Sequence, residues 1–284
     1  MAASNPLLHS RTSSQIKAFL EQPAHALALV GEDGAGKSFI AQYISNELLN
    51  NSKQYTFTVD ASVPKTGIEE VREAQKFLTL TVPGKATIKR VLIIEHLDSL
   101  GHEAQNSLLK TLEEPPVDTV IITTFSKPQA VLVTIHSRIH PVQILPVSEA
   151  AAVSYFADQP TSEVVKAHMI SSGAVGLMSS IITNDSEQPL LVGINHAREL
   201  LTSSRYQRLA TTEKLLKQNT VSPSTIIDGL YRLLQASYHQ ALSKKSKDEL
   251  KIMAQRLRLV EQALDDLAQN VQAKLVFDRL FLEL

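Results

Sequence analysis

Hydrophobic and polar positions follow two alternating patterns from the amino terminus to about residue 146. Short, β-rich apolar runs are separated by stretches with the three-and-four spacing of amphipathic helices. The runs are apolar at consecutive positions, which is typical of strands buried on both faces of a parallel sheet. The predicted strands cover 26–30, 55–59, 91–94, 120–124 and 142–145, and the predicted helices 39–49, 68–78 and 104–112. This part is therefore predicted to be an α/β domain.

Beyond Pro146 the strand-like runs stop and helical periodicity continues to the carboxyl terminus. Ser148 has a side chain suited to cap the first of these helices. The predicted helices cover 150–157, 162–170, 174–182, 193–202, 207–218, 223–242 and 248–284. A polar segment at 183–188 divides them. We therefore expect three parts, namely an α/β domain at 1–146, a small helical domain at 147–186 and a larger helical domain at 187–284.

The segment from Gly31 to Ser38 fits the pattern G-x-x-x-x-G-K-[ST] and lies between a predicted strand and a predicted helix. Glycines such as Gly34 and Gly36 let the backbone curl so that its amides point inward, and the helix amino terminus adds partial positive charge. Lys37 is expected to pair with the outer phosphates of a nucleotide, and Ser38 to hold Mg²⁺. The alternative is a glycine-rich turn without a ligand, but the full motif in this context favours phosphate binding.

Hydrolysis of a bound nucleotide requires acidic residues after a second apolar strand. The candidate strand at 91–94 is followed by Glu95 and His96. Glu95 is the candidate metal and catalytic carboxylate, and His96 stands where a water-activating Glu would act. Another register would make Glu95 the water-activating group and leave Ile94 at the metal, and Asp98 would compensate only if the strand end bends. The pattern favours a nucleotide-binding site with weak hydrolysis over a competent ATPase.

Composition narrows the range of functions. The 284 residues include 28 Lys and Arg against 29 Asp and Glu, and 43% are hydrophobic. This predicts buried cores and excludes a dedicated basic nucleic-acid module. The absence of cysteine excludes disulfides, and with the nine His scattered singly it argues against a zinc site. The polar amino terminus and the lack of a membrane-length apolar run predict a soluble, cytoplasmic protein without membrane contact.

The helix after the third predicted strand carries a more specific signal. The run from Ala104 to Pro116, AQNSLLKTLEEPP, closely resembles a signature of the clamp-loader AAA+ proteins of bacterial DNA polymerase III. The later segment Thr134–Arg138, TIHSR, is similar to another motif of that family, although Ile139 replaces its usual Cys. Each piece alone reads as a helix core, a helix terminator or a surface arginine. Together, in order, they identify the family resemblance over residues 15–183.

The resemblance implies a RecA-like AAA+ core, a small helical lid at 147–186 and a helical collar at 187–284 that joins five subunits into a ring. It implies ATP or ADP with Mg²⁺ as the nucleotide and Arg138 as an arginine finger that acts in trans on a neighbouring subunit. The sensor position falls at Ser126, with Thr124 as second choice. The implied partners are gamma/tau-like and delta-like subunits, and the sliding clamp and primer–template DNA through the assembled complex.

Departures from the family pattern bear on the type of subunit. The motor type, gamma/tau, has Asp-Glu where this chain has Glu95-His96, and it has an Arg in the lid motif that the segment at 173–176 lacks. The four-Cys zinc module of the family is also missing, and the stretch between Leu49 and Tyr55 is too short for it. This pattern implies a delta-prime type that has little ATPase of its own. The alternatives are a gamma/tau-type motor or, from another class, a small-molecule kinase.

Overall fold

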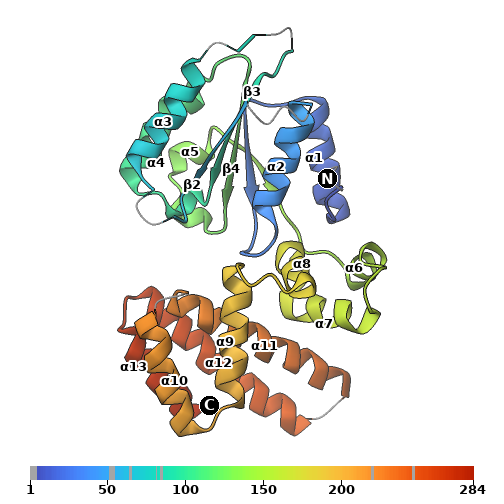
Figure 1. The fold of residues 1–284 in the computed structure, drawn as a ribbon, viewed down its shortest axis with the longest axis vertical. Helices are drawn as coiled ribbons and strands as arrows, with labels where there is room; N and C mark the ends of the chain where they lie inside the picture. Colours follow the sequence, from blue (N-terminus) through green and yellow to red (C-terminus); the bar gives the residue numbers. More distant parts are fainter. Residues whose placement is uncertain are drawn as a thin grey trace. The chain divides into compact units, whose positions relative to one another are not determined.

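The computed structural model describes residues 5–50, 55–63, 66–80, 82–83, 86–218, 221–244 and 247–284. It divides into two compact units, Met1–Ser148 and Glu149–Leu284 (Figure 1). The further boundary expected at 186 stays a prediction, and most of the short stretch before Tyr55 lies outside the described residues. In the described part of the chain no helix combines the length and the apolar character that crossing a membrane requires.

The first unit is built on a parallel five-stranded sheet with the strand order β2-β3-β4-β1-β5. Its first strand pairs on one side with β4, where Leu29 faces Thr124, and on the other with β5, where Leu29 faces Val142. The strands are β1 (Ala26–Val30), β2 (Thr56–Asp60), β3 (Arg90–Glu95), β4 (Thr119–Phe125) and β5 (His140–Gln143). The predicted α/β architecture is therefore confirmed.

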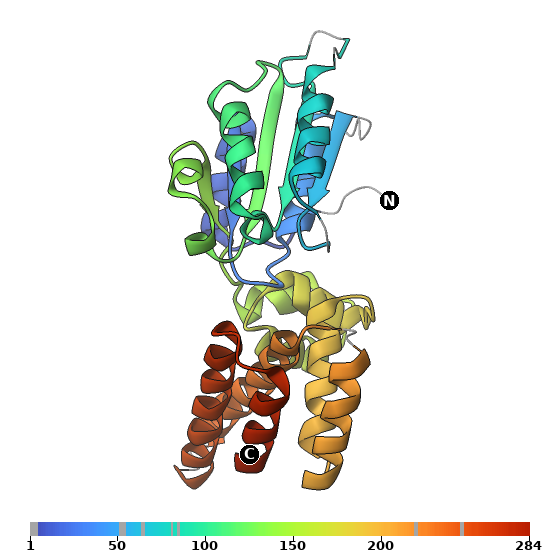
Figure 2. The ribbon, with the colours of Figure 1, turned by 90° about the vertical axis from the view of Figure 1, so that its left-hand side faces the viewer.

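Side chains of each central strand alternate between the two faces of the sheet, and helices cover both. Leu27 and Leu29 join one core with α1 and α2, whereas Ala28 and Val30 join the other with α3, α4 and α5 (Figure 2). Burial on both faces explains why the strands are continuous apolar runs. The helices are α1 (Ser10–Glu21), α2 (Lys37–Leu48), α3 (Ile68–Thr79), α4 (His102–Glu113) and α5 (Val133–His136).

Three elements of this unit differ most from the sequence-based prediction, namely the helices α1 and α5, which the pattern did not predict, and the last strand. Helix α1 was not predicted, because its first half is polar and only three of its positions, Thr12, Ile16 and Phe19, are buried. The last strand begins two residues earlier than expected and ends at Gln143, and only Val142 within it is buried. The Thr12 hydroxyl donates to the Gln143 carbonyl at 2.8 Å and thus ties α1 to this edge strand.

A buried arginine holds together the end of the sheet opposite the strand carboxyl ends. Arg90, at the start of β3, is 4% exposed. Its Nη1 donates to the carbonyl of Leu80 at 2.6 Å and to that of Leu78, and its Nη2 donates to Asp118 Oδ1 at 2.6 Å. Burial acts to raise the pKa of Asp118, but the hydrogen bond and positive charge of Arg90 outweigh it, so this pKa lies below its ordinary value.

All regular elements in the described residues of the second unit are helices. Its helices are α6 (Glu149–Tyr155), α7 (Thr161–Ser171), α8 (Val175–Thr183), α9 (Pro189–Thr202), α10 (Arg205–Gln218), α11 (Pro223–Lys244), α12 (Lys247–Ala268) and α13 (Ala273–Glu283). The single helix predicted at 248–284 is wrong, since the chain breaks at Asn270, whose φ of 61° is left-handed. A residue in that conformation ends a helix.

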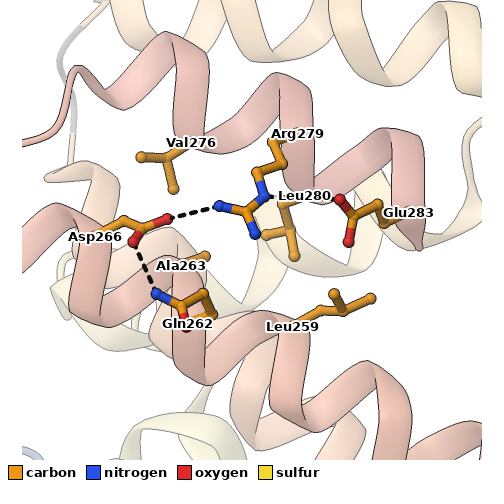
Figure 3. A pocket seen from close by; sticks show the side chains of 8 residues that line it. All are labelled: Leu259, Gln262, Ala263, Asp266, Val276, Arg279, Leu280 and Glu283. Atoms are coloured by element: carbon orange, nitrogen blue, oxygen red, sulfur yellow. Dashed lines mark hydrogen bonds and ion pairs between the residues drawn. The ribbon is translucent and has the colours of Figure 1, made fainter.

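Helices α12 and α13 pack through apolar side chains that include Val260, Ala263, Val276 and Leu280. At the edge of this contact Arg279 lies 3.5 Å from Asp266 and 3.6 Å from Glu283 (Figure 3). The arginine thus links the two helices around the break at Asn270. The apolar contact between the two helices accounts for the hairpin, where the sequence pattern predicted one continuous helix.

Glycines let α9 and α11 approach unusually closely. A Cβ at Gly229 would lie 2.7 Å from the backbone carbon and oxygen of Gly193, and a Cβ at Gly193 would lie 2.5 Å from the carbonyl oxygen of Thr225. Distances this short to backbone atoms cannot be relieved by a side-chain rotation. The helices must therefore separate if either glycine gains a side chain.

The variant Gly229→Ala is expected to lower the free energy of unfolding of the helical unit by about 2 kcal/mol, because forced separation outweighs the roughly 1 kcal/mol by which Ala favours a helix over Gly. Urea denaturation followed by far-ultraviolet circular dichroism measures this. Gly101→Ala is the control, since a Cβ there meets nothing within 4 Å. Equal stability of Gly229→Ala and wild type would contradict the close crossing.

Candidate functional site

The phosphate-binding motif forms a compact loop between β1 and α2. Gly34 and Gly36 have φ values of 83° and 87°, a left-handed conformation that favours glycine. Gly36 directly precedes the first residue of α2. At Gly31 a Cβ would lie 2.9 Å from the Ile144 carbonyl oxygen, so a side chain has no room there. The glycines thus allow the curled backbone that the motif predicts.

Lys37 is the first residue of α2, and its buried side chain reaches back to the loop. Its Nζ donates to the carbonyl oxygens of Gly31 and Glu32, both at 2.8 Å. It also donates to Ser126 Oγ at 2.9 Å, beyond the end of β4. The structure thus brings together two predicted site residues, Lys37 and Ser126, that are far apart in the sequence.

The electrostatic surroundings of Lys37 act in two directions. Burial lowers the pKa of its ammonium group, and the carboxylates of Asp33, Asp98 and Glu32 partly offset this. Asp33 Oδ1 lies 3.8 Å from Lys37 Nζ. The loop therefore holds a desolvated cation that several carboxylates compensate.

The predicted magnesium ligands also meet. Ser38, in the first turn of α2, donates its hydroxyl to Glu95 Oε2 at 2.7 Å, at the end of β3. Ligand atoms of Asp60, Glu95 and His96 lie within 4.8 Å of one another. His96 has a left-handed φ of 54°, and its amide donates to Thr124 Oγ1 at 3.1 Å. The second choice for the sensor position, Thr124, thus contacts the His96 backbone, whereas Ser126 contacts Lys37.

Asp98 has a role that the sequence did not reveal. Its Oδ2 accepts hydrogen bonds from the backbone amides of Ser126 at 3.1 Å and Lys127 at 2.9 Å, so the carboxylate is engaged here rather than as the substitute metal ligand that the sequence allowed. These bonds tie the segment after β3 to the segment after β4. Asp98 therefore holds the backbone that positions the Ser126 hydroxyl next to Lys37.

The chemistry of these groups fits a magnesium nucleotide. The Ser38 hydroxyl and the Glu95 carboxylate are hard oxygen donors of the kind that Mg²⁺ prefers. Loop amides, the amino terminus of α2 and the Lys37 ammonium are suited to phosphate oxygens. The backbone curl required for such a cradle is present at Gly34 and Gly36. These residues are therefore able to hold the group that the motif implies.

Arg138 lies in a separate place, just after α5. Its Nη1 donates to the Thr134 carbonyl at 2.7 Å and to Ser137 Oγ at 3.0 Å. Its Nη2 donates to Glu113 Oε1 at 2.6 Å, at the end of α4. The side chains of Arg138 and Glu113 are 31% and 49% exposed. The guanidinium is therefore accessible at the surface, and its partners belong to α4 and α5 rather than to the phosphate loop.

Comparison with protein families and characterised sequences gives partial matches. The family described as DNA polymerase III, delta subunit, matches residues 56–148. The DNA polymerase III subunit delta' of Pseudomonas aeruginosa is 26% identical over 41% of this chain and 42% of that protein. The corresponding Bacillus subtilis subunit is 33% identical over 36% and 29%. The chain thus spans less than half the length of these relatives.

A longer match joins the chain to a related class. The replication factor C small subunit of Staphylothermus marinus is 24% identical over 93% of this chain and 88% of that protein. The solved structure of a Thermotoga maritima DNA polymerase III gamma subunit-related protein aligns with a TM-score of 0.56, at 15% identity over 96% of this chain and 98% of that one. The fold is that of RecA-like AAA+ proteins, and in sequence the chain is similar to DNA polymerase III delta' subunits and to a replication factor C small subunit.

Proposed function

We propose that this chain is a clamp-loader subunit of the delta-prime type in the DNA polymerase III holoenzyme. It binds ATP or ADP weakly or as a structural ligand, and it donates Arg138 to the ATP site of a neighbouring subunit. The proposal rests on one observation. A complete phosphate loop lies next to the end of β3, where Glu95 and His96 stand, while Arg138 remains accessible at the surface. The residues expected to bind the nucleotide are thus present, whereas the Asp-Glu pair that hydrolysis uses in the motor type is replaced by Glu95 and His96.

The contacts around Lys37 and Ser38 support nucleotide binding. Loop amides and the Lys37 ammonium would hold the phosphates, and Ser38 with Glu95 would hold the metal. When bound, Mg²⁺ neutralises phosphate charge. His96 stands where hydrolysis needs a carboxylate, and an imidazole orients an attacking water less well beside a triphosphate. The same arrangement thus favours binding over turnover.

The position of Arg138 supports action on a neighbour. Its side chain is partly exposed and makes its contacts in α4 and α5. A guanidinium that enters an adjacent site stabilises the charge that develops on the transferring phosphoryl group. Hydrolysis at that site then depends on assembly. The proposed partners are gamma/tau-like and delta-like subunits in a pentameric ring, and through it the sliding clamp and primer–template DNA.

One contact favours a second candidate, the gamma/tau-type motor. Glu95 is one methylene longer than the usual Asp, and its Oε2 still accepts a hydrogen bond from Ser38 at 2.7 Å. The two expected metal ligands are therefore close together, as a motor would require. A motor would then need Glu95 or Asp98 to orient water. Asp98 already accepts hydrogen bonds from two backbone amides, which argues against a role in orienting water.

Reconstitution tests the proposal. We expect the full chain to form a stable complex with gamma/tau-like and delta-like subunits of the same organism, as measured by size-exclusion chromatography and mass spectrometry. The isolated chain should hydrolyse ATP negligibly. Robust ATPase of the isolated chain that Lys37→Ala abolishes would favour the motor, and failure to join any such complex would contradict a clamp-loader role.

A further inference from the structure

The phosphate loop contains an acidic residue, Asp33, whose side chain contacts both Lys37, which is expected to pair with the outer phosphates, and Ser126, the predicted sensor residue. Asp33 Oδ1 lies 3.8 Å from Lys37 Nζ and accepts a hydrogen bond from Ser126 Oγ. Ser126 Oγ in turn accepts a hydrogen bond from Lys37 Nζ at 2.9 Å. Asp33, Ser126 and Lys37 thus form a closed triangle of polar contacts. An anionic group already engages the cation and the hydroxyl that the nucleotide site would use.

The other carboxylates near Lys37 are arranged differently. Asp98 is engaged by the backbone amides of Ser126 and Lys127. Glu32 is an exposed residue whose backbone carbonyl, rather than its carboxylate, accepts from Lys37. Within the described residues, Asp33 is the one carboxylate at ion-pair distance from Lys37. Its effect on the site should therefore exceed that of its neighbour Glu32.

The side chain of Asp33 is 54% exposed. It therefore has room to leave the triangle when a ligand enters, and the obstacle to the ligand is electrostatic rather than steric. A terminal phosphate must displace the carboxylate from Lys37 and Ser126 and then remain close to its charge. A diphosphate carries less negative charge and has no third phosphate to place there.

We propose that Asp33 is a specificity-determining residue that competes with the terminal phosphate for Lys37 and Ser126, so that the site selects nucleoside diphosphate over triphosphate. This rests on the nucleotide binding proposed above. Competition by Asp33 would explain, from within the loop, why the chain binds ATP weakly. The selectivity would be present before any hydrolysis takes place.

The test is calorimetric titration of the full chain with Mg-ATP and Mg-ADP. Asp33→Asn keeps the shape but removes the charge, and it is expected to raise the affinity for ATP by roughly tenfold and that for ADP by less, as the loss of one nearby like charge implies. Asp33→Glu retains the charge and should retain the preference for ADP. Glu32→Gln is the matched control, and its ratio of affinities should stay close to that of wild type.

The outcomes separate the two proposals. If Lys37→Ala loses binding but Asp33→Asn leaves the ATP-to-ADP ratio unchanged, nucleotide binding stands and the role of Asp33 is overturned. An equal change in Glu32→Gln would also overturn it, because any loop charge would then have the same effect. If the wild-type chain binds neither nucleotide, or if Lys37→Ala binds like wild type, the proposed nucleotide binding and the role of Asp33 both fail, whereas the clamp-loader role is decided by the reconstitution. Circular dichroism verifies that each variant is folded.

Discussion

Replacing Arg138 with Ala is expected to lower ATP hydrolysis at the neighbouring site of the assembled loader by roughly a thousandfold. The cause is the loss of the guanidinium that would stabilise charge on the transferring phosphoryl group. Because the side chain lies at the surface and pairs with the half-exposed Glu113, its removal should leave the fold and the assembly intact. DNA-stimulated ATPase of the reconstituted complex measures the effect, and size-exclusion chromatography measures assembly.

Matched variants separate this role from a general charge effect. Arg138→Lys keeps the charge but loses the planar fork, so it should recover only a small part of the activity. Glu113→Gln removes the ion-pair partner, whereas Glu114→Gln changes the adjacent exposed carboxylate and serves as the control. ATPase at the wild-type level in the complex that contains Arg138→Ala would refute the arginine finger.

Arg90→Met is expected to lower the free energy of unfolding of the first unit by about 3 kcal/mol. The variant leaves the carbonyl oxygens of Leu78 and Leu80 without their buried donor, and it leaves Asp118 without its cation. These groups lie away from the phosphate loop, so nucleotide affinity of the folded protein should not change. Chemical denaturation measures the stability, and Arg72→Met, at an exposed position of α3, is the control.

The same ion pair predicts a dependence on pH. The folded-state pKa of Asp118 is lowered, so the pair contributes stability above the ordinary Asp pKa of about 3.9 and loses it as the pH falls through the folded-state value. The difference in stability between wild type and Arg90→Met should therefore narrow in acid, down to the part that comes from the hydrogen bonds to the Leu78 and Leu80 carbonyls. A constant difference down to low pH would contradict this assignment.

The elements with a repeated apolar signal could be predicted from the sequence. Strands β1 and β3 were predictable because both of their faces are buried, which makes their sequences continuous apolar runs. Helix α1 was missed because its three buried positions give a weak signal, and Thr12 among them is itself polar. The break at Asn270 was missed because the apolar spacing continues across it, whereas the left-handed backbone does not.

The site was predictable where a motif fixes the residue type. The loop glycines, Lys37 and Ser38 follow from the pattern, and the family resemblance implies Ser126. The contacts of Asp33 and Glu113 could not be predicted, because the motif leaves the position of Asp33 open and Glu113 meets Arg138 only once α4 and α5 are packed. The hydrogen bonds from the Ser126 and Lys127 amides to Asp98 likewise form only once the segments after β3 and β4 have reached their final positions.

The strand order has a consequence for the order of folding. The phosphate loop leaves β1, and both neighbours of β1 come late in the chain, since Ala26 pairs with Ile121 and Leu27 with His140. A ribosome-bound chain that ends before β4 therefore has no strand on which β1 can form its ladder, and closing so long a loop carries an entropic cost. We expect the loop to acquire its shape only after nearly all of the first unit has been synthesised, so that nucleotide cannot bind to a shorter nascent chain.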